Sequence, residues 1–394
     1  MSIYFSHLNS AVSILKSYKD NEPFHLFIKK YFSANKKYGS KDRKQITSLC
    51  YNYFRLGKAA KNISTEERIL FGAFLCKKKS SAFLQNIKPE WNTLIEKSIE
   101  EKLSIAKNEF AIKNIFPFKD ELSEMIDAEK FSQSFLIQPE LFLRIRPNYN
   151  EKVTGKLAGA GLSYKKIIEN CISLPNSSKI NEVLELDIEA VVQDYNSQRV
   201  GAFIQLSIVN RQLPISLWDC CAASGGKSIM AYDINPKIEL TVSDKRGSIL
   251  DNLKKRFAKA GIKKFHSFVA DLSNGRGAVS DLIGKNYDLI ICDAPCTGSG
   301  TWARTPEQLY FFKKESIEKY ATLQKVIIKN VVEYLKPGGK LLYVTCSVFK
   351  KENEDVVKYA EEKLNLKLLK KEVLKGYEMK ADTMFAALFT VPVR

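Results

Sequence analysis

The pattern of hydrophobic and polar residues divides the chain into a helical part, a short mixed part and a part in which strands and helices alternate. Up to about residue 112, hydrophobic residues such as Leu8, Val12 and Leu15 recur at helical spacing. Beyond about residue 215, short apolar runs alternate with amphipathic stretches. They predict strands over 216–220, 239–243, 264–270, 287–292 and 339–344, and helices over 227–232, 248–260, 317–334 and 353–363. This alternation predicts an α/β fold with a mostly parallel, doubly wound sheet.

Between these parts, Leu141 to Arg146 alternates apolar and basic residues and is followed by Pro147, which predicts a strand with one basic face. Further short β-like runs occur at 172–174 and 183–186. We therefore expect three segments. They are a helical domain over 1–112, a connector helix with a small α/β subdomain over 113–205, and the doubly wound domain over 206–394.

Charge changes this picture by indicating a polyanionic partner. The chain has 62 Lys and Arg against 44 Asp and Glu, a net charge of +18, and residues 1–88 alone hold 17 against 5, a net of +12. Such a concentration favours nucleic acid over a membrane surface, although a merely solvated basic face is the alternative. In the helical part we expect the lysines to contact phosphates and the interleaved aromatic residues to form the core.

The cysteine and histidine content points to a reducing compartment. The eight cysteines lack the density of a disulfide framework, and the three histidines show no metal-ligand spacing. No apolar run approaches the ~18 residues of a membrane span. We therefore expect a cytoplasmic protein with no metal and no membrane partner. Cys292 is expected in the core, and Cys220 and Cys221 are expected to serve as small packing residues.

A run of small residues after the first predicted strand of the doubly wound part is a candidate cofactor loop. Small residues let the backbone turn tightly, and the following helix offers free amides to an anionic group. The spacing fits neither the dinucleotide fingerprint nor the phosphate loop, and an ordinary strand-to-helix turn is the alternative. The loop residues are Cys221, Ala222, Ala223, Ser224, Gly225, Gly226 and Lys227.

An acidic residue also follows each of the next two predicted strands, those over 239–243 and 264–270. Asp244 is placed to accept both ribose hydroxyls of a nucleoside, and Asp271 to accept from an adenine amine. An adenosine with a carboxylate-bearing tail and no phosphate describes S-adenosylmethionine, which we expect as the cofactor.

Two cysteines follow two further predicted strands and are the sharpest chemical signal. Cys296 comes shortly after the strand that ends near Asp293, and Cys346 follows the last predicted strand. In a parallel sheet both thiols would face the crevice at the carboxyl edge. Alone, they could form a disulfide, a redox couple or half a metal site. Beside a carboxylate they suggest covalent chemistry on an electrophilic ring.

Over roughly residues 138–394 these motifs resemble the Sun-type (Fmu-like) RNA cytosine-5 methyltransferases. The segments 219–227, 293–300 and 345–347 resemble the family's cofactor loop and its two cysteine motifs. Ser224 stands where the family usually has proline, and no glycine follows Asp382 in the closing segment. Residues 1–112 resemble the NusB-like RNA-binding domain of bacterial members that modify small-subunit rRNA.

The resemblance implies a Rossmann-like methyltransferase domain and unequal roles for the two thiols. Cys346 would attack carbon 6 of cytosine, Asp293, also near the cofactor, would stabilise the adduct near N3, and Cys296 would assist product release. Substrate contacts are expected at Arg144, Pro295 and Arg304. The implied substrate is rRNA and the expected state a monomer. The alternatives are a tRNA cytosine-5 methyltransferase and a non-catalytic, NusB-like rRNA-binding assembly factor.

Overall fold

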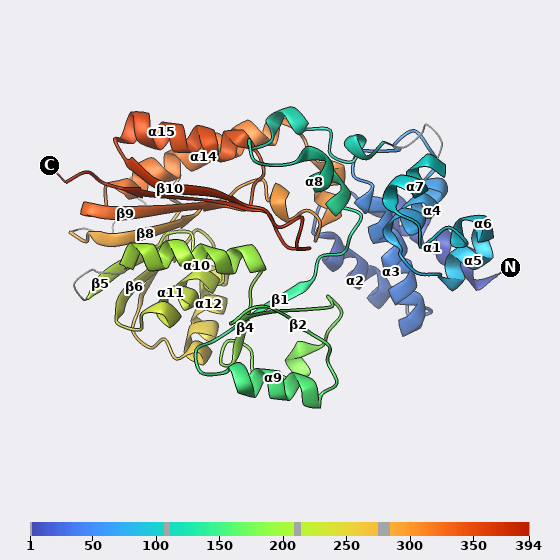
Figure 1. Ribbon diagram of the computed structural model, residues 1–394, viewed down its shortest axis with the longest axis horizontal. Helices are drawn as coiled ribbons and strands as arrows, with labels where there is room; N and C mark the ends of the chain where they lie inside the picture. Colours follow the sequence, from blue (N-terminus) through green and yellow to red (C-terminus); the bar gives the residue numbers. More distant parts are fainter. Residues whose placement is uncertain (1, 106–110, 209–213, 275–283, 394) are drawn as a thin grey trace. The chain divides into compact units, whose positions relative to one another are not determined.

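The computed structural model describes residues 2–105, 111–208, 214–274 and 284–393, which fall into two compact units (Figure 1). Unit 1 consists of Met1–Asp120, Asp127–Gln138 and Trp302–Lys313, and unit 2 of Glu121–Ile126, Pro139–Thr301 and Lys314–Arg394. This division differs from the three predicted segments. The connector belongs mostly to the helical unit, whereas the small α/β subdomain belongs to the unit that carries the large sheet.

Unit 1 is helical, as predicted. Its helices are α1 (Ile3–Ser17), α2 (Phe24–Ala34), α3 (Ser40–Arg55), α4 (Thr65–Cys76), α5 (Ala82–Ile87), α6 (Pro89–Asn92), α7 (Ile99–Ile105), α8 (Ala128–Ser134) and α13 (Pro306–Phe311). The aromatic residues form its core, because the rings of Tyr18, Phe24 and Phe54 contact one another edge to face with centroids 5.0–6.0 Å apart.

Helix α13 comes from the sequence of the doubly wound part, yet it packs in unit 1. Its Tyr310 hydroxyl hydrogen-bonds the Tyr53 hydroxyl at 2.9 Å, and the Phe311 ring contacts the Tyr18 ring. The Lys58 ammonium donates to the carbonyls of Tyr310 and Phe312, at 2.8 Å each. The polypeptide therefore leaves unit 2 at residue 301, contributes one short helix to unit 1, and returns at residue 314.

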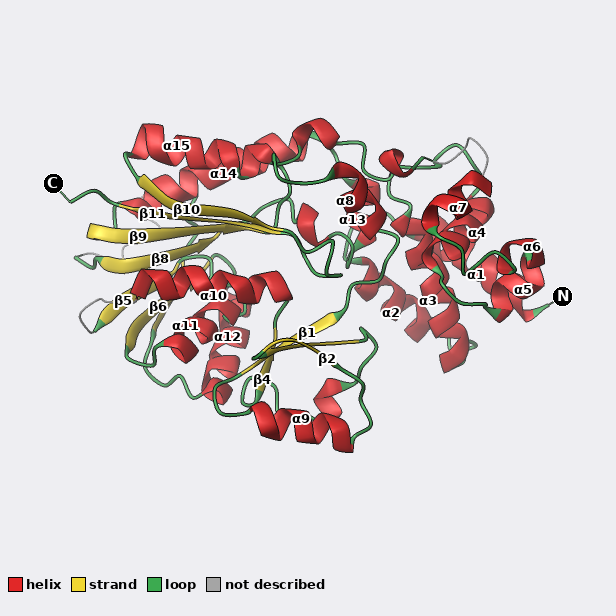
Figure 2. Ribbon diagram, viewed as in Figure 1, coloured by secondary structure: helices red, strands yellow, loops and turns green. Residues whose placement is uncertain are grey.

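The large sheet of unit 2 confirms the α/β prediction (Figure 2). Its seven strands run in the order β10-β11-β9-β8-β5-β6-β7; β11 and β10 are antiparallel to their neighbours, and the other five strands are parallel. The bounds are β5 (Ile215–Asp219), β6 (Ile238–Asp244), β7 (His266–Val269), β8 (Tyr287–Asp293), β9 (Leu335–Thr345), β10 (Lys367–Leu374) and β11 (Met384–Thr390). All five predicted strands are present, within a few residues at each end.

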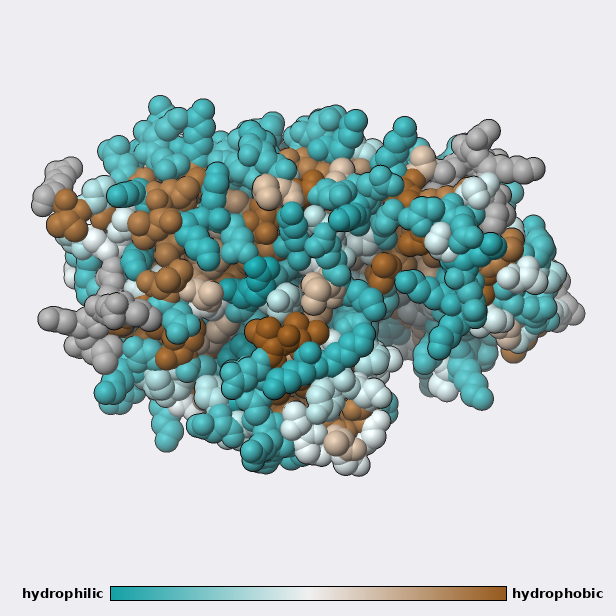
Figure 3. All heavy atoms as spheres, in the orientation of Figure 1, coloured by the Kyte–Doolittle hydropathy of each residue, from teal (hydrophilic) through white to brown (hydrophobic). Residues whose placement is uncertain are grey.

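Helices cover both faces of this sheet. One face packs against α10 (Tyr195–Ile208), α11 (Gly226–Ile234) and α12 (Gly247–Ala260), and the other against α14 (Glu315–Val332) and α15 (Glu354–Leu364). In Figure 3 the outer surface over α14 and α15 is predominantly hydrophilic, as expected for helices that bury one apolar face. Helix α10 was not predicted.

The small subdomain is a four-stranded antiparallel sheet in the order β2-β3-β1-β4, with one helix, α9 (Asn150–Gly159). The strands are β1 (Leu141–Ile145), β2 (Lys165–Ile168), β3 (Cys171–Leu174) and β4 (Ala190–Val192). The run 172–174 is a strand as predicted. The run 183–186 is not, because a 3₁₀ turn over Ile180–Glu182 precedes it and only Leu186 forms an isolated bridge. Within the described residues, no helix is long and apolar enough to span a membrane.

Candidate active site

The predicted cofactor loop follows β5 at the carboxyl edge of the parallel strands. Gly225 precedes α11 with φ +82°, and a Cβ there would come within 2.6 Å of Phe257. Glycine is therefore required at this turn for both its left-handed backbone and its close packing. The tight turn brings the N-terminus of α11 to the edge of the sheet, next to the end of β8.

A cavity of about 300 Å³ opens at this edge. It is lined by most of the predicted loop residues together with Asp293 and Cys346, whereas Gly225, Asp244 and Asp271 are not among its lining residues. The predicted residues that line it are Cys221, Ala222, Ala223, Ser224, Gly226, Lys227, Asp293 and Cys346. Asp219, the first residue of the segment that resembles the family's cofactor loop, also lines it. Arg256 and Asp382 line it too, although the sequence predicted no cofactor contact for either.

An ion pair joins the cofactor loop to the first cysteine motif. The Lys227 ammonium lies 2.6 Å from a carboxylate oxygen of Asp293, and Lys227 is buried. Burial by itself lowers the pKa of Lys227, but the adjacent carboxylate more than offsets it, and the net pKa is raised. The pair fixes a positive and a negative group side by side at the edge of the cavity.

Asp219 is a buried carboxyl group with one oxygen satisfied and one not. Its Oδ2 accepts from the Ser228 hydroxyl at 2.6 Å, while Oδ1 has no hydrogen-bond partner. Burial raises the pKa of Asp219 to about 7. A buried carboxyl oxygen without a partner, in a residue that lines a cavity, fits a cationic or hydrogen-bond-donating group of a bound molecule.

Asp244 and Asp271 lie at the predicted strand ends. Asp244 ends β6, where its carboxylate accepts from the Ala223 amide at 3.1 Å and from Arg246. Asp271 follows β7 and accepts from the amide and hydroxyl of Ser273. The carboxylate of Asp244 therefore supports the cofactor loop directly. The Asp271 carboxylate is held by its own turn.

Arg256 of α12 holds the loop at the position where proline is usual in the resembling family. Its guanidinium donates to the carbonyl and the hydroxyl of Ser224, at 2.8 and 2.9 Å, and also pairs with Asp187. This bridge restrains the loop through a side chain where a proline ring would restrain the backbone. No local spacing in the sequence could have revealed it, because the two residues are 32 positions apart.

The two cysteines meet as predicted. The Sγ atoms of Cys296 and Cys346 lie 3.2 Å apart, too far for a disulfide of about 2.05 Å, and both thiols are free. The hydrogen bond to Cys346 and burial raise the pKa of the Cys296 thiol well above its usual range. Cys296 therefore retains its proton at neutral pH, and either sulfur can donate in the contact between the two thiols.

A buried carboxylate ties the two cysteine loops together. Glu352 is fully buried and accepts from the Thr297 amide (2.9 Å), the Thr297 hydroxyl (2.6 Å), the Ser347 hydroxyl (2.6 Å) and the Gln324 amide (2.9 Å). Gly300 adds a backbone bond, from its N–H to the Cys346 carbonyl at 2.8 Å. The relative position of the two thiols is therefore set by a shared hydrogen-bond network.

The three residues predicted to contact the substrate lie in different parts of the structure. Arg144 is buried, with its guanidinium on Asp233 at 2.6 Å and on Gln193, so it joins β1 to α11 within unit 2. Pro295 lies in the cysteine motif, and its carbonyl accepts from Gln324. Arg304 belongs to the segment that packs in unit 1.

Two basic residues of unit 1 donate hydrogen bonds to backbone carbonyls within the unit. Arg55 is buried and donates to the carbonyls of Phe135 and Ile137, and Lys58 donates to the carbonyls of Tyr310 and Phe312. These groups therefore hold segments of the unit together, and we do not count them among the basic residues expected to contact phosphates.

The mostly parallel seven-stranded sheet, with a small-residue loop and a cavity at its carboxyl edge, defines the class of S-adenosylmethionine-dependent methyltransferase folds. Residues 204–390 match the family described as 16S rRNA methyltransferase RsmB/F, so this part of the chain is similar to that family.

Curated relatives agree with this similarity. Ribosomal RNA small subunit methyltransferase B of Shewanella oneidensis is 35% identical over 141 residues, and that of Salmonella paratyphi A is 32% identical over 171 residues. These matches cover 35% and 42% of this chain but only 32% and 37% of the relatives. The similarity thus spans about a third of each relative's length.

The similarity to solved structures extends over more of the chain than the similarity in sequence to the curated relatives. The protein PH0851 matches over 99% of both chains with a TM-score of 0.69 at 18% identity. NSun6 from Pyrococcus horikoshii with SFG matches 71% of this chain and 96% of its own, with a TM-score of 0.57 at 17% identity. At these identities the likeness establishes the fold.

Proposed function

We propose that this protein is an S-adenosylmethionine-dependent RNA cytosine-5 methyltransferase acting on small-subunit rRNA, through a covalent bond between Cys346 and the cytosine. The observation that carries the proposal is the pair of sulfur atoms 3.2 Å apart, one of them lining a cavity also lined by the Lys227–Asp293 ion pair. Two curated relatives are named as small-subunit rRNA methyltransferases, and this supports the choice of rRNA.

The cavity residues fit the cofactor. The unpartnered Oδ1 of Asp219 suits the ammonium of its methionine portion, and the amides at the start of α11 suit its carboxylate. Asp244, already fixed by Ala223 and Arg246, would accept from the ribose hydroxyls at the next strand end. When bound, the cofactor supplies an electrophilic methyl group at its sulfonium.

The chain's own residues account for the activation of the base. The Cys346 thiolate adds to carbon 6 of cytosine, forming a carbon–sulfur bond and moving the ring electrons toward N3 and carbon 5. The Lys227–Asp293 pair stabilises the charge that develops at N3 and supplies the proton there. Carbon 5 is then nucleophilic enough to accept the methyl group. Loss of the carbon-5 proton to water and breakage of the carbon–sulfur bond return the Cys346 thiolate, and the N3 proton returns to the Lys227–Asp293 pair, which leaves neutral 5-methylcytosine.

Cys296 has a separate task in this scheme. Its raised pKa keeps a proton next to the Cys346 sulfur, where an S–H donor stabilises the thiolate as it forms and as it leaves. A Cys296 variant would therefore slow the release of Cys346 from the base more than the attack. The Glu352 network maintains the geometry that this exchange requires.

Unit 1 supplies the RNA-binding surface in this proposal. Exposed basic residues lie on α2, at the start of α3 and in the loop between them. They are Lys29, Lys30, Lys36, Lys37, Lys41, Arg43 and Lys44. Within this set, Lys30 pairs with Glu22 and the Arg43 guanidinium donates to the Tyr38 carbonyl. A cluster of this kind contacts phosphates without reading bases, and base recognition is left to the catalytic crevice, which takes an unpaired or flipped cytosine.

Bisulfite sequencing of total RNA from cells with and without the gene tests the proposal. We expect one cytosine of small-subunit rRNA to lose its protection from conversion when the gene is deleted, and to regain it with the wild-type gene but not with Cys346→Ala. Loss of protection in a tRNA instead would redirect the substrate assignment. Unchanged protection at every cytosine would refute the enzymatic proposal.

A further inference from the structure

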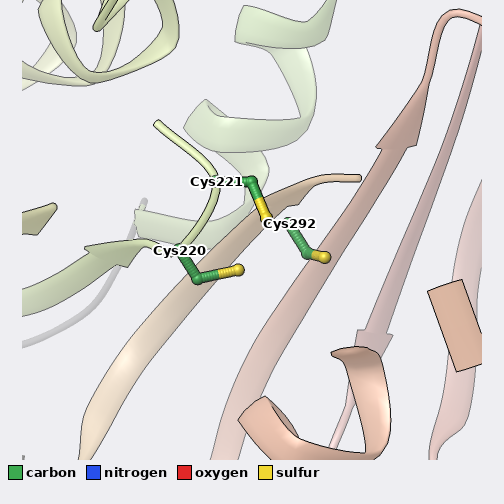
Figure 4. Close-up of side chains that lie close together, drawn as sticks. All are labelled: Cys220, Cys221 and Cys292. Carbon is green, nitrogen blue, oxygen red and sulfur yellow. The ribbon is translucent and has the colours of Figure 1, made fainter. Parts of the chain in front are cut away.

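Three cysteines that the reaction does not use converge beside the cofactor cavity. Cys220 and Cys221 follow β5, and Cys292 lies in the neighbouring strand β8 (Figure 4). Their three Sγ atoms all lie within 4.8 Å of one another. In the part of the chain that the structure describes, this is the one group of three or more His, Cys, Asp or Glu side chains with ligand atoms so close. From the sequence, Cys220 and Cys292 were expected only as packing or core residues, whereas Cys221 was expected both as a packing residue and in the cofactor loop.

The backbone that carries these thiols is rigidly placed. The Cys220 amide donates to the Ile291 carbonyl at 2.9 Å, and its carbonyl accepts from the Ser243 hydroxyl at 2.9 Å. The same Ser243 hydroxyl accepts from the indole of Trp218. Cys220 and Cys292 are fully buried in the core next to α14, whereas Cys221 is half-buried and lines the cofactor cavity. The cluster therefore has two fixed inner members and one member accessible from the cavity.

These separations are close to those of a thiolate metal site. With zinc–sulfur bonds of about 2.3 Å, the sulfur atoms of a tetrahedral site lie about 3.8 Å apart. The Sγ atoms of the three cysteines lie at most 4.8 Å apart, so small side-chain rotations would bring them to the separation of a zinc site. Three protein ligands leave a fourth position, and the placement of Cys221 directs that position toward the cavity, from which water can complete the tetrahedron.

The net charge of the metal–thiolate cluster favours one thiophilic ion over another. Three thiolates around a divalent ion leave a net charge of −1, whereas three thiolates around Cu(I) leave −2. Burying the larger charge costs more, and the nearby Asp293 carboxylate already pairs with Lys227, so this cation does not offset the extra negative charge. A divalent d¹⁰ ion is therefore favoured over monovalent copper.

We propose that Cys220, Cys221 and Cys292 form a binding site for a thiophilic divalent cation, zinc in the first instance, with an open coordination position facing the cofactor cavity. Binding replaces up to three S–H protons, which are released to solvent. Because Cys221 and the adjoining Ala222 and Ala223 line the cavity, metal occupancy would oppose cofactor binding; this second part rests on the proposed function. The site would make the enzyme sensitive to free thiophilic metal.

Cobalt(II) titration of the metal-free, reduced full-length protein tests the site, because tetrahedral thiolate coordination gives intense sulfur-to-cobalt charge-transfer absorption. We expect one cobalt per chain, displaced by zinc, and at least tenfold weaker binding in Cys220→Ser and Cys221→Ser. Cys221 is half-buried, so its variant remains informative if a core substitution fails to fold. The matched control is Cys171→Ser, a buried cysteine of β3 outside the cluster.

The adjacent thiols of Cys296 and Cys346 are the other candidate ligands for cobalt, so a variant that lacks both is a control. The double variant Cys296→Ser/Cys346→Ser should still bind cobalt with the same absorption. Absorption that disappears in this variant, persists in Cys220→Ser and Cys221→Ser, or never develops in the wild type overturns the proposal.

Calorimetry with S-adenosylhomocysteine separates the metal site from the proposed function. We expect at least tenfold weaker binding to zinc-loaded than to metal-free protein. Equal affinity for both forms would overturn the antagonism. The absence of heat with metal-free protein would contradict the cofactor assignment while leaving the cobalt result standing.

Discussion

Removing the Glu352 carboxylate should disturb the geometry of both cysteine loops. Its Oε2 accepts from two N–H groups, those of Thr297 and Gln324, and its Oε1 accepts from the hydroxyls of Thr297 and Ser347. In Glu352→Gln, the amide oxygen can replace Oε2, and the hydroxyls can rotate to accept from the new NH₂ group. In Glu352→Ala, both N–H groups lose their partner in a buried site.

The two variants should therefore differ in the free energy of unfolding that they lose. Each orphaned buried N–H costs about 1–3 kcal/mol, so Glu352→Ala should lower the free energy of unfolding by about 2–6 kcal/mol. The glutamine variant exchanges charge-assisted bonds for neutral ones but no longer buries a charge, and should lose about 1–2 kcal/mol. A misplacement of about 1 Å at a reacting group costs about 100-fold in rate, which is the loss of turnover expected for the alanine variant.

Urea unfolding and steady-state methylation with RNA measure these effects, with the exposed Glu361→Gln of α15 as control, expected within about 0.5 kcal/mol of wild type. Cofactor affinity should not change, since Glu352 is not among the cavity-lining residues. An alanine variant of wild-type stability and turnover, or one that loses cofactor affinity and keeps its turnover, would show that Glu352 does not position the two cysteine loops.

Three further predictions concern the cofactor loop, the buried acid and the RNA surface. Arg256→Ala removes two hydrogen bonds to Ser224 and should weaken S-adenosylhomocysteine binding about tenfold in calorimetry, about 1.4 kcal/mol; unchanged affinity would show that the bridge is dispensable. Because the pKa of Asp219 is raised to about 7, the neutral form stabilises the fold at low pH. This contribution is lost as pH rises from about 4, the unfolded value, to about 7, so wild type should lose about 4 kcal/mol relative to Asp219→Asn over that window in urea titrations, and parallel curves would contradict the assignment. The double variant Lys36→Glu/Lys37→Glu should weaken RNA binding and lower the salt dependence by about one unit of slope for each of the two lysines that binds a phosphate, whereas an unaltered slope would exclude this surface.

The sheet and its chemical edge could be predicted from the sequence because both depend on local patterns. Apolar runs of strand length marked β5 to β9, and the small-residue loop and the two cysteine motifs follow those strands directly. Parallel strands bring their carboxyl ends to one edge, so Asp293, Cys296 and Cys346 could be grouped before the fold was known.

The features that could not be predicted are those that depend on long-range packing. The segment 302–313 follows a catalytic motif yet packs with the amino-terminal helices, which no local periodicity encodes. Arg144 and Arg55 look like surface cations in the sequence, but their burial follows from distant partners. The cluster of Cys220, Cys221 and Cys292 was overlooked for the same reason, because β5 and β8 become neighbours only in the folded sheet.

Covalent trapping on RNA tests the proposed bond between Cys346 and the cytosine. Cys296→Ala and Cys346→Ala are incubated with substrate RNA and S-adenosylmethionine, and protein–RNA adducts are resolved by denaturing electrophoresis and mass spectrometry. We expect a stable adduct attached through Cys346 in the Cys296 variant and no adduct in the Cys346 variant. An adduct in the Cys346 variant, or none in the Cys296 variant, would contradict the proposed bond.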